Sequence, residues 1–444
     1  MESGIFHRDT PGAPRAPGVY YETRAEPRPQ FALRTAVPVF VGFAEWMSSE
    51  RDSSGIHHID RWQQFLHWYK PLPESYLGHA VRGFFENGGE QCVVMPVRSN
   101  RGDPENMRDA LVHSFSPGAP LDNFDDIDLV CVPDAMLPRI RETGSGAVLA
   151  IQSAVLEHCR RMGDRFAILD GFASDPRLGP APDNRGVGEA ISHWRSLPPE
   201  HGALYFPWVH VRKSLFSGIS DALSGMALPC DRQATGNRDS QTGFADFLIP
   251  RLVPPCGHVA GVYSRTDARI GVHKAPANEI LEGVLEPGVD LTDAEHETLN
   301  QAGVNCLRNL GGRGIRVWGA RTLSGQPQWR YVNVRRLFLT LTRWIRQNMH
   351  DLVFEGNDPL LWEHVGRRLT AHCRDLFDRG ALMGDSPAQA FFVKCDAETN
   401  TRESREAGTV IADVGLAPAV PAEFVVVRIT QSASTIAVSG LNLL

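Results

Sequence analysis

The feature that most restricts the fold is a set of uninterrupted apolar segments that alternate with an amphipathic helix between about residues 125 and 210. The segments IDLVCVP, RFAILDGF and ALYFPWVHV are apolar almost throughout. Between the first two, GAVLAIQSAVLEHCRRM places Val148, Ile151, Val155 and Cys159 at helical spacing. Strands that are apolar on both faces are typical of parallel sheets covered by helices. We therefore predict a buried, largely parallel α/β sheet in this region.

The segments on either side differ in character. Before residue 101, TAVPVFVGFAEW and QCVVMPV predict strands, and RWQQFLHWY and YLGHAVRGFFENGG predict helices. After about residue 290, a capping box at Thr292 and Glu295 starts a helix, and GIRVWGART and WRYVNV predict two strands. The segments RRLFLTLTRWIRQNM and, from Asp358 to Gly380, DPLLWEHVGRRLTAHCRDLFDRG predict amphipathic helices. These changes predict domain boundaries near residues 101 and 290.

Charge and composition limit the cellular setting. The net charge of −7 over 444 residues argues against bulk attraction to nucleic acid or to a membrane surface. The opening segment MESGIFHRDTPGAPRAPG has no apolar core, and no apolar run approaches the roughly 20 residues of a membrane helix. The eight cysteines are scattered without a CxxC pair, which favours reduced thiols over a disulfide framework. We predict a protein made and assembled in the cytoplasm.

No catalytic pattern is complete in the sequence. Phosphate-binding loops, GxGxxG after a strand and GxSxG elbows are missing. Asp170 follows the strand RFAIL, where α/β enzymes place carboxylates, although an Asp-Gly pair there is more often a turn. Cys256 and His258 lack further ligands at metal spacing, and the neighbours His158 and Cys159 point about 100° apart on a helix. We predict no enzyme, no cofactor and no metal, with a hydrolase or nucleotide-binding activity of the α/β region as the alternative.

Eight arginines lie between residues 313 and 350, where the chain has no acidic residue: Arg313, Arg316, Arg321, Arg330, Arg335, Arg336, Arg343 and Arg346. One interpretation is that they pair with acids elsewhere in the same domain. The other is a basic face that docks on an acidic protein partner. The segment lacks the surroundings of a known nucleic-acid-binding fold, so direct nucleic-acid binding is not predicted.

The two ends of the chain raise a further question. FVVVRITQ, which starts at Phe424, predicts a strand that Thr435 to Val438 can extend, and PGVYYET near the start holds a short extended piece. A terminal strand offers unpaired backbone groups. It either pairs within its own domain or pairs with another molecule.

Several long segments resemble those of one known family. They are PGVYYET, HAVRGFFENGGEQCVV, GHVAGVYSRTDARIGVHKAPANEIL, LNQAGVNCLRNLGGRGIRVWGARTLS, WRYVNVRRL, VFEGNDPLLWEHV, GALMGDSPAQAFFVKCD and PAEFVVVRI. In this order they resemble the phage tail sheath family, which includes the sheaths of R-type pyocins and of phage-tail-like contractile injection systems. The resemblance is dense from about 255 to 431 and faint from 98 to 254.

The resemblance implies an architecture. It is an α+β core domain assembled from N- and C-terminal segments, with an inserted α/β domain and extended terminal β-strand arms. The expected ranges are an arm at 1–35, core parts at 36–100 and 291–423, an outward-facing insertion at 101–290 and a C-terminal strand arm at 424–444. The arms are expected to add strands to the sheets of neighbouring subunits through Val19, Tyr20, Tyr21, Phe424, Val425, Val426, Val427, Arg428 and Ile429.

The resemblance also implies partners and a mechanism. Subunits form stacked hexameric rings around an inner tube protein, with baseplate and terminator or cap proteins at the ends, and contraction drives the tube through a target envelope. For contacts with the tube or a neighbouring subunit we expect arginines of the basic segment and of the helix after it: Arg335, Arg336, Arg343, Arg367, Arg368 and Arg374. A phage, a bacteriocin and an injection system remain open as the source particle. A monomeric binding module with a basic face is a further alternative.

Overall fold

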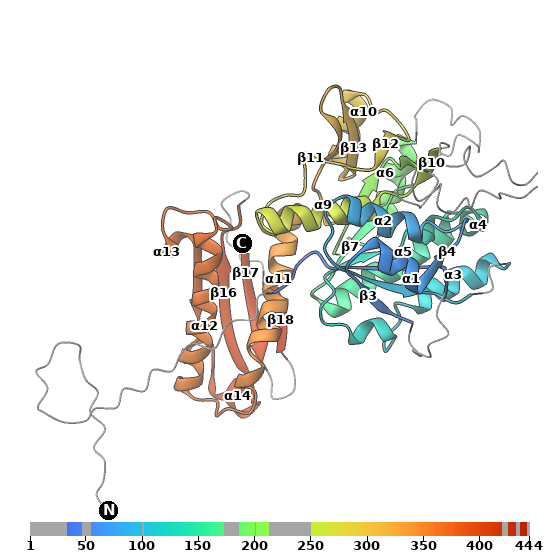
Figure 1. Cartoon of the computed structure of the whole chain (residues 1–444). Coiled ribbons are helices and arrows are strands. Elements are labelled where there is room, and N and C mark those ends of the chain that lie inside the picture. Colours follow the sequence, from blue (N-terminus) through green and yellow to red (C-terminus); the bar gives the residue numbers. More distant parts are fainter. Residues whose placement is uncertain are drawn as a thin grey trace, which may run out of the picture. The chain divides into compact units, whose positions relative to one another are not determined.

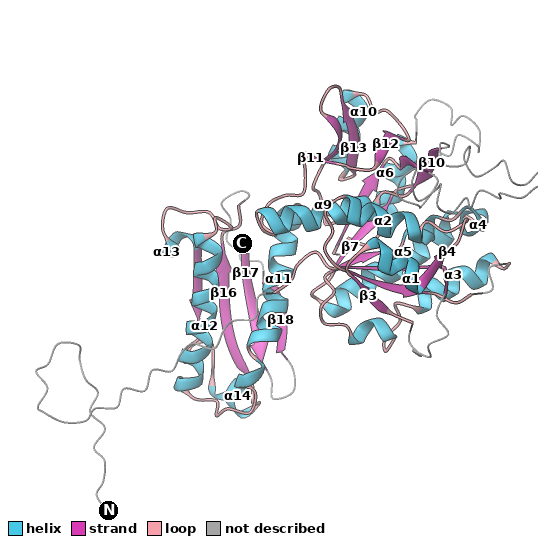
Figure 2. Ribbon diagram, viewed as in Figure 1, coloured by secondary structure: helices cyan, strands magenta, loops and turns pink. Residues whose placement is uncertain are grey.

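The computed structural model describes residues 33–46, 55–99, 102–172, 186–199, 201–212, 250–419, 425–431 and 436–441, the last two segments and residue 250 as backbone only. The chain divides into two compact units, Met1–Ala32 and Leu33–Leu444. The described part of the second unit is a mixed α/β structure (Figures 1 and 2), as the sequence predicts. Among the described helices, none is both long and apolar enough to cross a membrane.

The larger part of this unit is built on a nine-stranded sheet. Its middle strands run parallel, and antiparallel strands close both edges. In sheet order the strands are β11 (Glu279–Ile280), β14 (Gly314–Trp318), β13 (Asn305–Leu310), β8 (Gly202–Phe206), β7 (Phe166–Asp170), β6 (Leu129–Cys131), β1 (Pro38–Gly42), β5 (Cys92–Pro96) and β3 (His57–Ile59).

The sheet corrects the domain boundary that we predicted near residue 101. Strands β1 and β5, from the expected core, are hydrogen-bonded in one sheet with β6, β7 and β8, from the expected insertion. Strands β13 and β14, beyond residue 290, belong to the same sheet and share its hydrophobic core. The loops near residue 101 therefore connect neighbouring elements of one sheet and do not separate two folded units.

Helices and short strands surround this sheet. The helices are α1 (Trp62–Trp68), α2 (Leu77–Glu86), α3 (Pro104–His113), α4 (Pro138–Glu142), α5 (Ser145–Met162), α6 (Val187–Ser196), α9 (Cys256–Arg269) and α10 (Asp293–Ala302), with short 3₁₀ turns η1 (Pro120–Asn123) and η2 (Pro133–Met136). A three-stranded sheet has the order β10 (Pro250–Val253), β9 (Val209–Arg212) and β12 (Val284–Pro287), and β2 (Ala44–Trp46) pairs with β4 (Tyr69–Pro71).

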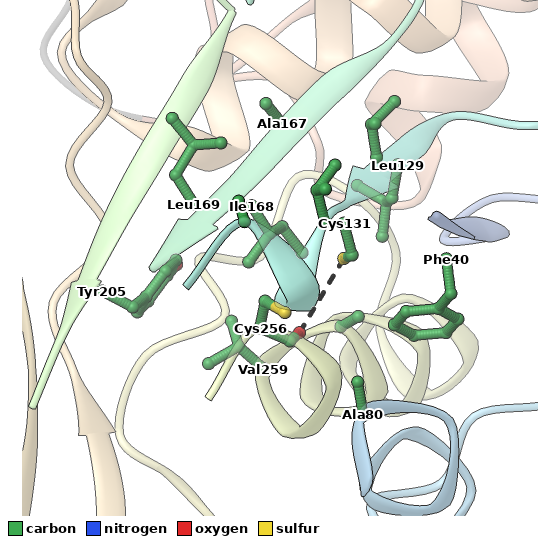
Figure 3. Close-up of a cluster of buried hydrophobic side chains, with 14 of the residues drawn as sticks. Phe40, Ala80, Leu129, Cys131, Ala167, Ile168, Leu169, Tyr205, Cys256 and Val259 are labelled. Atoms are coloured by element: carbon green, nitrogen blue, oxygen red, sulfur yellow. Dashed lines mark hydrogen bonds between the residues drawn. The ribbon is translucent and has the colours of Figure 1, made fainter. Parts of the chain in front are cut away.

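Helices α2 and α9 cross at unusually close range because glycines line the contact. A Cβ atom placed on Gly257 would lie 2.1 Å from the carbonyl oxygen of Ala80, and one on Gly261 would lie 2.4 Å from that of Phe84. The close approach holds α9 against β6 and β7, and the Cys131 thiol at the end of β6 donates to the carbonyl oxygen of Cys256 across 3.9 Å (Figure 3).

A second hydrophobic core begins at residue 329 and forms a smaller layer. The layer contains α11 (Val332–Asn348), α12 (Pro359–Asp378), α13 (Pro387–Ala390), α14 (Arg402–Glu406), and turns η5 (Pro327–Trp329) and η6 (His350–Leu352). Its sheet has the order β15 (Phe391–Lys394), β16 (Val410–Leu416), β17 (Val425–Gln431) and β18 (Ile436–Leu441), all antiparallel, with α12 alongside (Figure 2).

Two local predictions are wrong. WRYVNV does not form a strand: η5 ends at Trp329, Tyr331 makes only an isolated bridge to Arg321, and α11 already begins at Val332. The apolar spacing of α11 already includes Val332 and Val334. Packing of the helix therefore outweighs the β-propensity of the tyrosine and valines in this segment. The segment from Ile436 does not extend the preceding strand but turns back to pair with it.

Candidate assembly surfaces

Strand β16 is central to the C-terminal sheet and pairs on both sides. On one side Phe391–Lys394 of β15 pairs with Leu416–Asp413 of β16, and on the other all seven residues of β16 have partners in β17. Val414 and Leu416 are buried against the helices of this layer. In the described part of the chain, β15 and β18 are the outer strands of this sheet.

The outer strand β15 carries an exposed aromatic residue. The Phe392 ring, 40% exposed, covers Gly415 on β16, where a Cβ atom would lie 2.1 Å from the ring. A glycine opposite an aromatic residue lets the ring lie flat on the strand. The ring is thus held in place close to the free edge of β15.

The predicted inter-subunit strand residues divide into two groups. Val19, Tyr20, Tyr21 and Phe424 lie outside the described residues. Val425 to Ile429 form most of β17, which in this single chain pairs antiparallel with β16 of the same chain. The strand prediction for these residues is confirmed, and pairing with another subunit stays a prediction.

The arginines of α11 point into the molecule. Arg336 is 2% exposed and donates to Asp267 through two bonds of 2.6 and 3.0 Å, with Asp128 at 3.5 Å. Its guanidinium also lies 4.8 Å from the ring centre of Tyr263. Burial alone would lower the pKa of Arg336, but the two carboxylates outweigh it, raise the pKa and keep the group charged.

Arg343, two turns further along α11, is also 2% exposed. It donates to the backbone carbonyls of Arg34 (3.1 Å) and Asp126 (2.9 Å) and lies 3.7 Å from the Asp128 carboxylate. This corrects two of our predicted contact residues: Arg336 and Arg343 pair with acids and carbonyls of their own chain. Buried as they are, they are not part of a docking surface.

Two further arginines of α11 have partners in the larger part of the unit. Arg346 donates to Asp164 across 2.6 Å and to the carbonyl of Met162 across 2.8 Å. Arg335 is half-buried, contacts the His201 ring and lies 4.4 Å from the ring centre of Trp329. Burial, followed by the charge of Arg335, lowers the pKa of His201 to about 3, so that its imidazole is neutral.

The arginines of α12 are more accessible. Arg368 is bound bidentately by Asp351 (2.6 and 2.7 Å) and is about one-third exposed. Among the described residues, Arg367 makes an exposed pair with Glu363 at 3.2 Å, and such pairs contribute about 0–1 kcal/mol. Arg374 is exposed on the same helix. Arg367 and Arg374 are therefore the predicted contact residues that remain open to a partner.

An apolar pair lies at the start of α12. Phe354, in the loop before the helix, is 92% exposed and has a left-handed backbone (φ 74°), and Leu360 in the first turn is 62% exposed. Sequence reasoning missed these residues because apolar residues at a helix start are normally assigned to the core.

The carboxyl ends of the parallel strands, where α/β enzymes bind ligands, are used internally. Asp170, the last residue of β7, accepts from the Cys256 backbone N–H (2.8 Å) at the first position of α9. Asp134, just after β6, accepts from the backbone of Phe43 and Tyr76 (both 2.6 Å) and from the Ser75 hydroxyl (2.8 Å). Burial raises the pKa of Asp170 to about 7. Both carboxyl groups hold neighbouring segments in place.

A surface cavity of about 380 Å³ lies nearby, between α4, α5 and α6, lined by Arg141, Ser145, Leu149, Phe172, Glu189, Ser192, His193 and Ser196. His193, one of the lining residues, has both ring nitrogens engaged: Nδ1 accepts from the Phe172 N–H (3.2 Å), and Nε2 donates to Gln152 (2.6 Å). Burial lowers the pKa of His193 to about 3. The imidazole is thus a structural group. No cluster of three or more metal-ligating side chains occurs in the described residues.

The family models match the C-terminal half of the chain. The phage tail sheath protein central domain matches residues 207–323, and the phage tail sheath C-terminal domain matches residues 324–432. The tail sheath protein of Vibrio phage KVP40 is 26% identical over 188 residues, which are 41% of this chain and 27% of that protein. The chain therefore spans only about a quarter of the length of this curated relative.

Two solved structures are similar over nearly the whole chain. The helical sheath of the anti-feeding prophage in its contracted state has a TM-score of 0.65 and 27% identity, over 93% of this chain and 98% of that chain. The contracted PVC sheath complex of an extracellular contractile injection system has a TM-score of 0.63 and 26% identity, over 95% and 99% of the two chains.

Proposed function

The chain belongs to the phage tail sheath family, and we propose that it is the structural subunit of a contractile sheath. Copies polymerise in the bacterial cytoplasm as stacked hexameric rings around an inner tube, between a baseplate and a cap, and contraction drives the tube through a target envelope. The observation that carries this proposal is the similarity of 93–95% of the chain to the sheaths of the anti-feeding prophage and of an extracellular contractile injection system.

Electron microscopy of the purified full-length protein tests the proposal. We expect striated tubes or rings, because copies that share strands propagate into a lattice. A dispersed monomer under all assembly conditions, with the inner tube protein present, would refute the assignment.

We propose that β17 is the strand through which subunits are joined. In a single chain it pairs with its own β16 over seven positions. A neighbouring β16 offers the same seven positions in the same register, so exchange keeps every backbone hydrogen bond, each worth about 1 kcal/mol net. Pairing within a free subunit and exchange in the lattice are therefore alternatives of similar energy. The free edge of β15 is then available to the predicted N-terminal strand at Val19–Tyr21.

Cysteine trapping separates the two pairings. Asp413 and Arg428 are register partners across β16 and β17, and opposite residues of antiparallel strands are about 4.5–5.5 Å apart, within disulfide range. In oxidised tubes of the D413C/R428C variant we expect a ladder of covalent multimers on a denaturing gel. Single-cysteine variants serve as controls. Monomer bands alone would show that β17 stays in its own subunit. Deletion of residues 424–444 should leave a soluble monomer that forms no tubes.

We propose that the layer built on the second hydrophobic core, from η5 to β18, faces the tube and that the nine-stranded part faces outward. Exposed arginines on α12 support this orientation, because a helix with weakly paired cations suits an acidic partner surface. The double reversal R367E/R374E should abolish assembly around the tube. The variant R195E, at an exposed position of α6 in the nine-stranded part, is the control and should assemble normally. Unchanged assembly and contraction of R367E/R374E would remove these residues from the contact surface.

A further inference from the structure

A buried cluster of four charged side chains lies where the chain enters its folded unit. We call Asp128, Asp267, Arg336 and Arg343 the quartet. Their side chains are 2–7% exposed, and the two positive and two negative charges balance. They come from three distant parts of the chain: the segment before β6, helix α9 and helix α11. The boundary between the two compact units falls at Ala32 and Leu33, next to the residues that the quartet binds.

The quartet holds residues 34–37 from several sides. The Asp128 carboxylate accepts from the backbone N–H groups of Ala36 (2.9 Å) and Val37 (2.6 Å), and Arg343 donates to the carbonyl of Arg34 (3.1 Å). Thr35 is a hydrogen-bond partner of Asp267. Each of the four residues from Arg34 to Val37 is therefore bound to a member of the quartet.

The backbone at this point is in a conformation that needs such support. Ala36 has φ +55°, in the left-handed region, which costs a non-glycine residue roughly 1–2 kcal/mol. The two bonds from Asp128 fix this residue and the next, and thereby hold the backbone at the start of the described fold. On either side, Leu33 packs against the C-terminal core and Ala36 belongs to the core of the large sheet.

We propose that the quartet is the clamp through which force on the N-terminal arm enters the subunit. This inference rests on the proposed function, in which the arm is joined to a neighbouring copy. Force on the arm acts first on the hydrogen bonds that join residues 34–37 to Asp128 and Arg343. The ion pairs of Arg336 and Asp267 then transmit this force to helices α11 and α9. Both hydrophobic cores are thus loaded together. A clamp of hydrogen-bonded buried charges resists partial opening, because removing one member leaves an uncompensated charge.

Limited proteolysis of the unassembled full-length chain tests the clamp. Trypsin cuts after Arg34 only when residues 33–37 open, so the rate of this cut reports the open population. The variant Arg343→Met keeps the apolar stem but loses the bonds to Arg34 and Asp126. We expect the cut to become ten- to hundredfold faster, the effect of losing a hydrogen bond from a charged donor. Arg343→Lys keeps the positive charge and should fold even if Arg343→Met does not. Its rate of cutting after Arg34 should lie between the rates of wild type and Arg343→Met.

Arg346→Met is the matched control, because Arg346 lies on the same helix face but binds Asp164 and Met162, away from residues 33–37. It should leave the rate of the Arg34 cut unchanged. Equal rates for wild type, Arg343→Met and Arg343→Lys would overturn the clamp. This result does not depend on whether the chain forms tubes, which decides the proposed function separately.

The mechanical role has its own readout. Tubes of Arg343→Met should break under shear that wild-type and Arg346→Met tubes survive, with at least a twofold shorter median length by electron microscopy. Arg343→Met tubes as long and durable as wild type, with a faster Arg34 cut, would show that the clamp carries no force.

Discussion

Asp170 gives the sharpest test of the energetics inferred from this structure. Its carboxyl is fully buried, and burial raises its pKa to about 7 from an ordinary 3.8, against the opposing effect of the bond from the Cys256 N–H. Between pH 3.8 and 7 the folded chain keeps a proton that the unfolded chain has lost. Stability therefore falls as the pH rises through this window and levels off above it.

The magnitude follows from the same values. Each pH unit in this window costs about 1.4 kcal/mol, so the loss from pH 5 to pH 7 is about 3 kcal/mol. Asparagine in place of Asp170 keeps an oxygen that accepts from the Cys256 N–H but has no proton to lose. The difference in unfolding free energy between Asp170→Asn and wild type should therefore rise by about 3 kcal/mol from pH 5 to pH 8.

Urea denaturation of the unassembled chain at several pH values measures this difference, and the pH dependence of all other groups cancels in it. The control Asp378→Asn removes a carboxyl group at an exposed position of α12, and it measures what the loss of one charge does to stability at the same pH values. Parallel curves for Asp170→Asn and wild type between pH 5 and 8 would show that Asp170 is ionised in the fold, and the reasoning from burial would be wrong.

Three further substitutions test other parts of the fold. Gly257→Ala gains about 1 kcal/mol of helix propensity, but its methyl group would meet the Ala80 carbonyl at 2.1 Å, so thermal unfolding should show net destabilisation or no folded protein. Asp134→Asn points an amide N–H₂ at donors such as the Tyr76 N–H and should lower stability at neutral pH by about 1–3 kcal/mol, measured by urea denaturation. His258 has a pKa lowered to about 4 by burial and then by a nearby arginine, so the folded state resists its protonation and stability is lost as the pH falls from 6.5 to 4. His258→Gln should remove about 3 kcal/mol of that loss, and an unchanged acid transition would refute the assignment.

Local signals in the sequence predicted the elements that depend on local contacts. The capping box of Thr292 and Glu295 and the cap formed by Asp358 are present where the sequence places them. Gly380 has the positive φ expected after a helix. The uninterrupted apolar segments give parallel strands. In each case the determining groups are within about four residues of one another.

The predicted domain boundary near residue 101 was wrong because it depends on contacts between segments that are far apart in the sequence. Loop-rich sequence shows where one element ends. Strand pairing decides whether the next strand belongs to the same sheet or to another domain. The pairing of Val39 with both Val93 and Val130 joins segments almost forty residues apart on the two sides of that loop. Only the identity of the pairing partners shows that one sheet continues past residue 101. The apolar pattern within a single segment does not reveal which strand it pairs with.

The arginines of α11 show which part of the buried charge cluster can be predicted from the sequence and which part cannot. Val332, Arg336, Leu339, Arg343 and Arg346 recur at spacings of four and three residues, which places them on one stripe of the helix. Val332 and Leu339 pack into the core of the large sheet, whereas other faces of the helix pack into the second core. A helix buried on both sides cannot leave its cations in water. The stripe therefore needs internal acids, and the packing of α11 on both sides, which the structure shows, decides for that interpretation over a docking face. The acids themselves are 69 to 215 residues away in sequence, so only the tertiary fold identifies them.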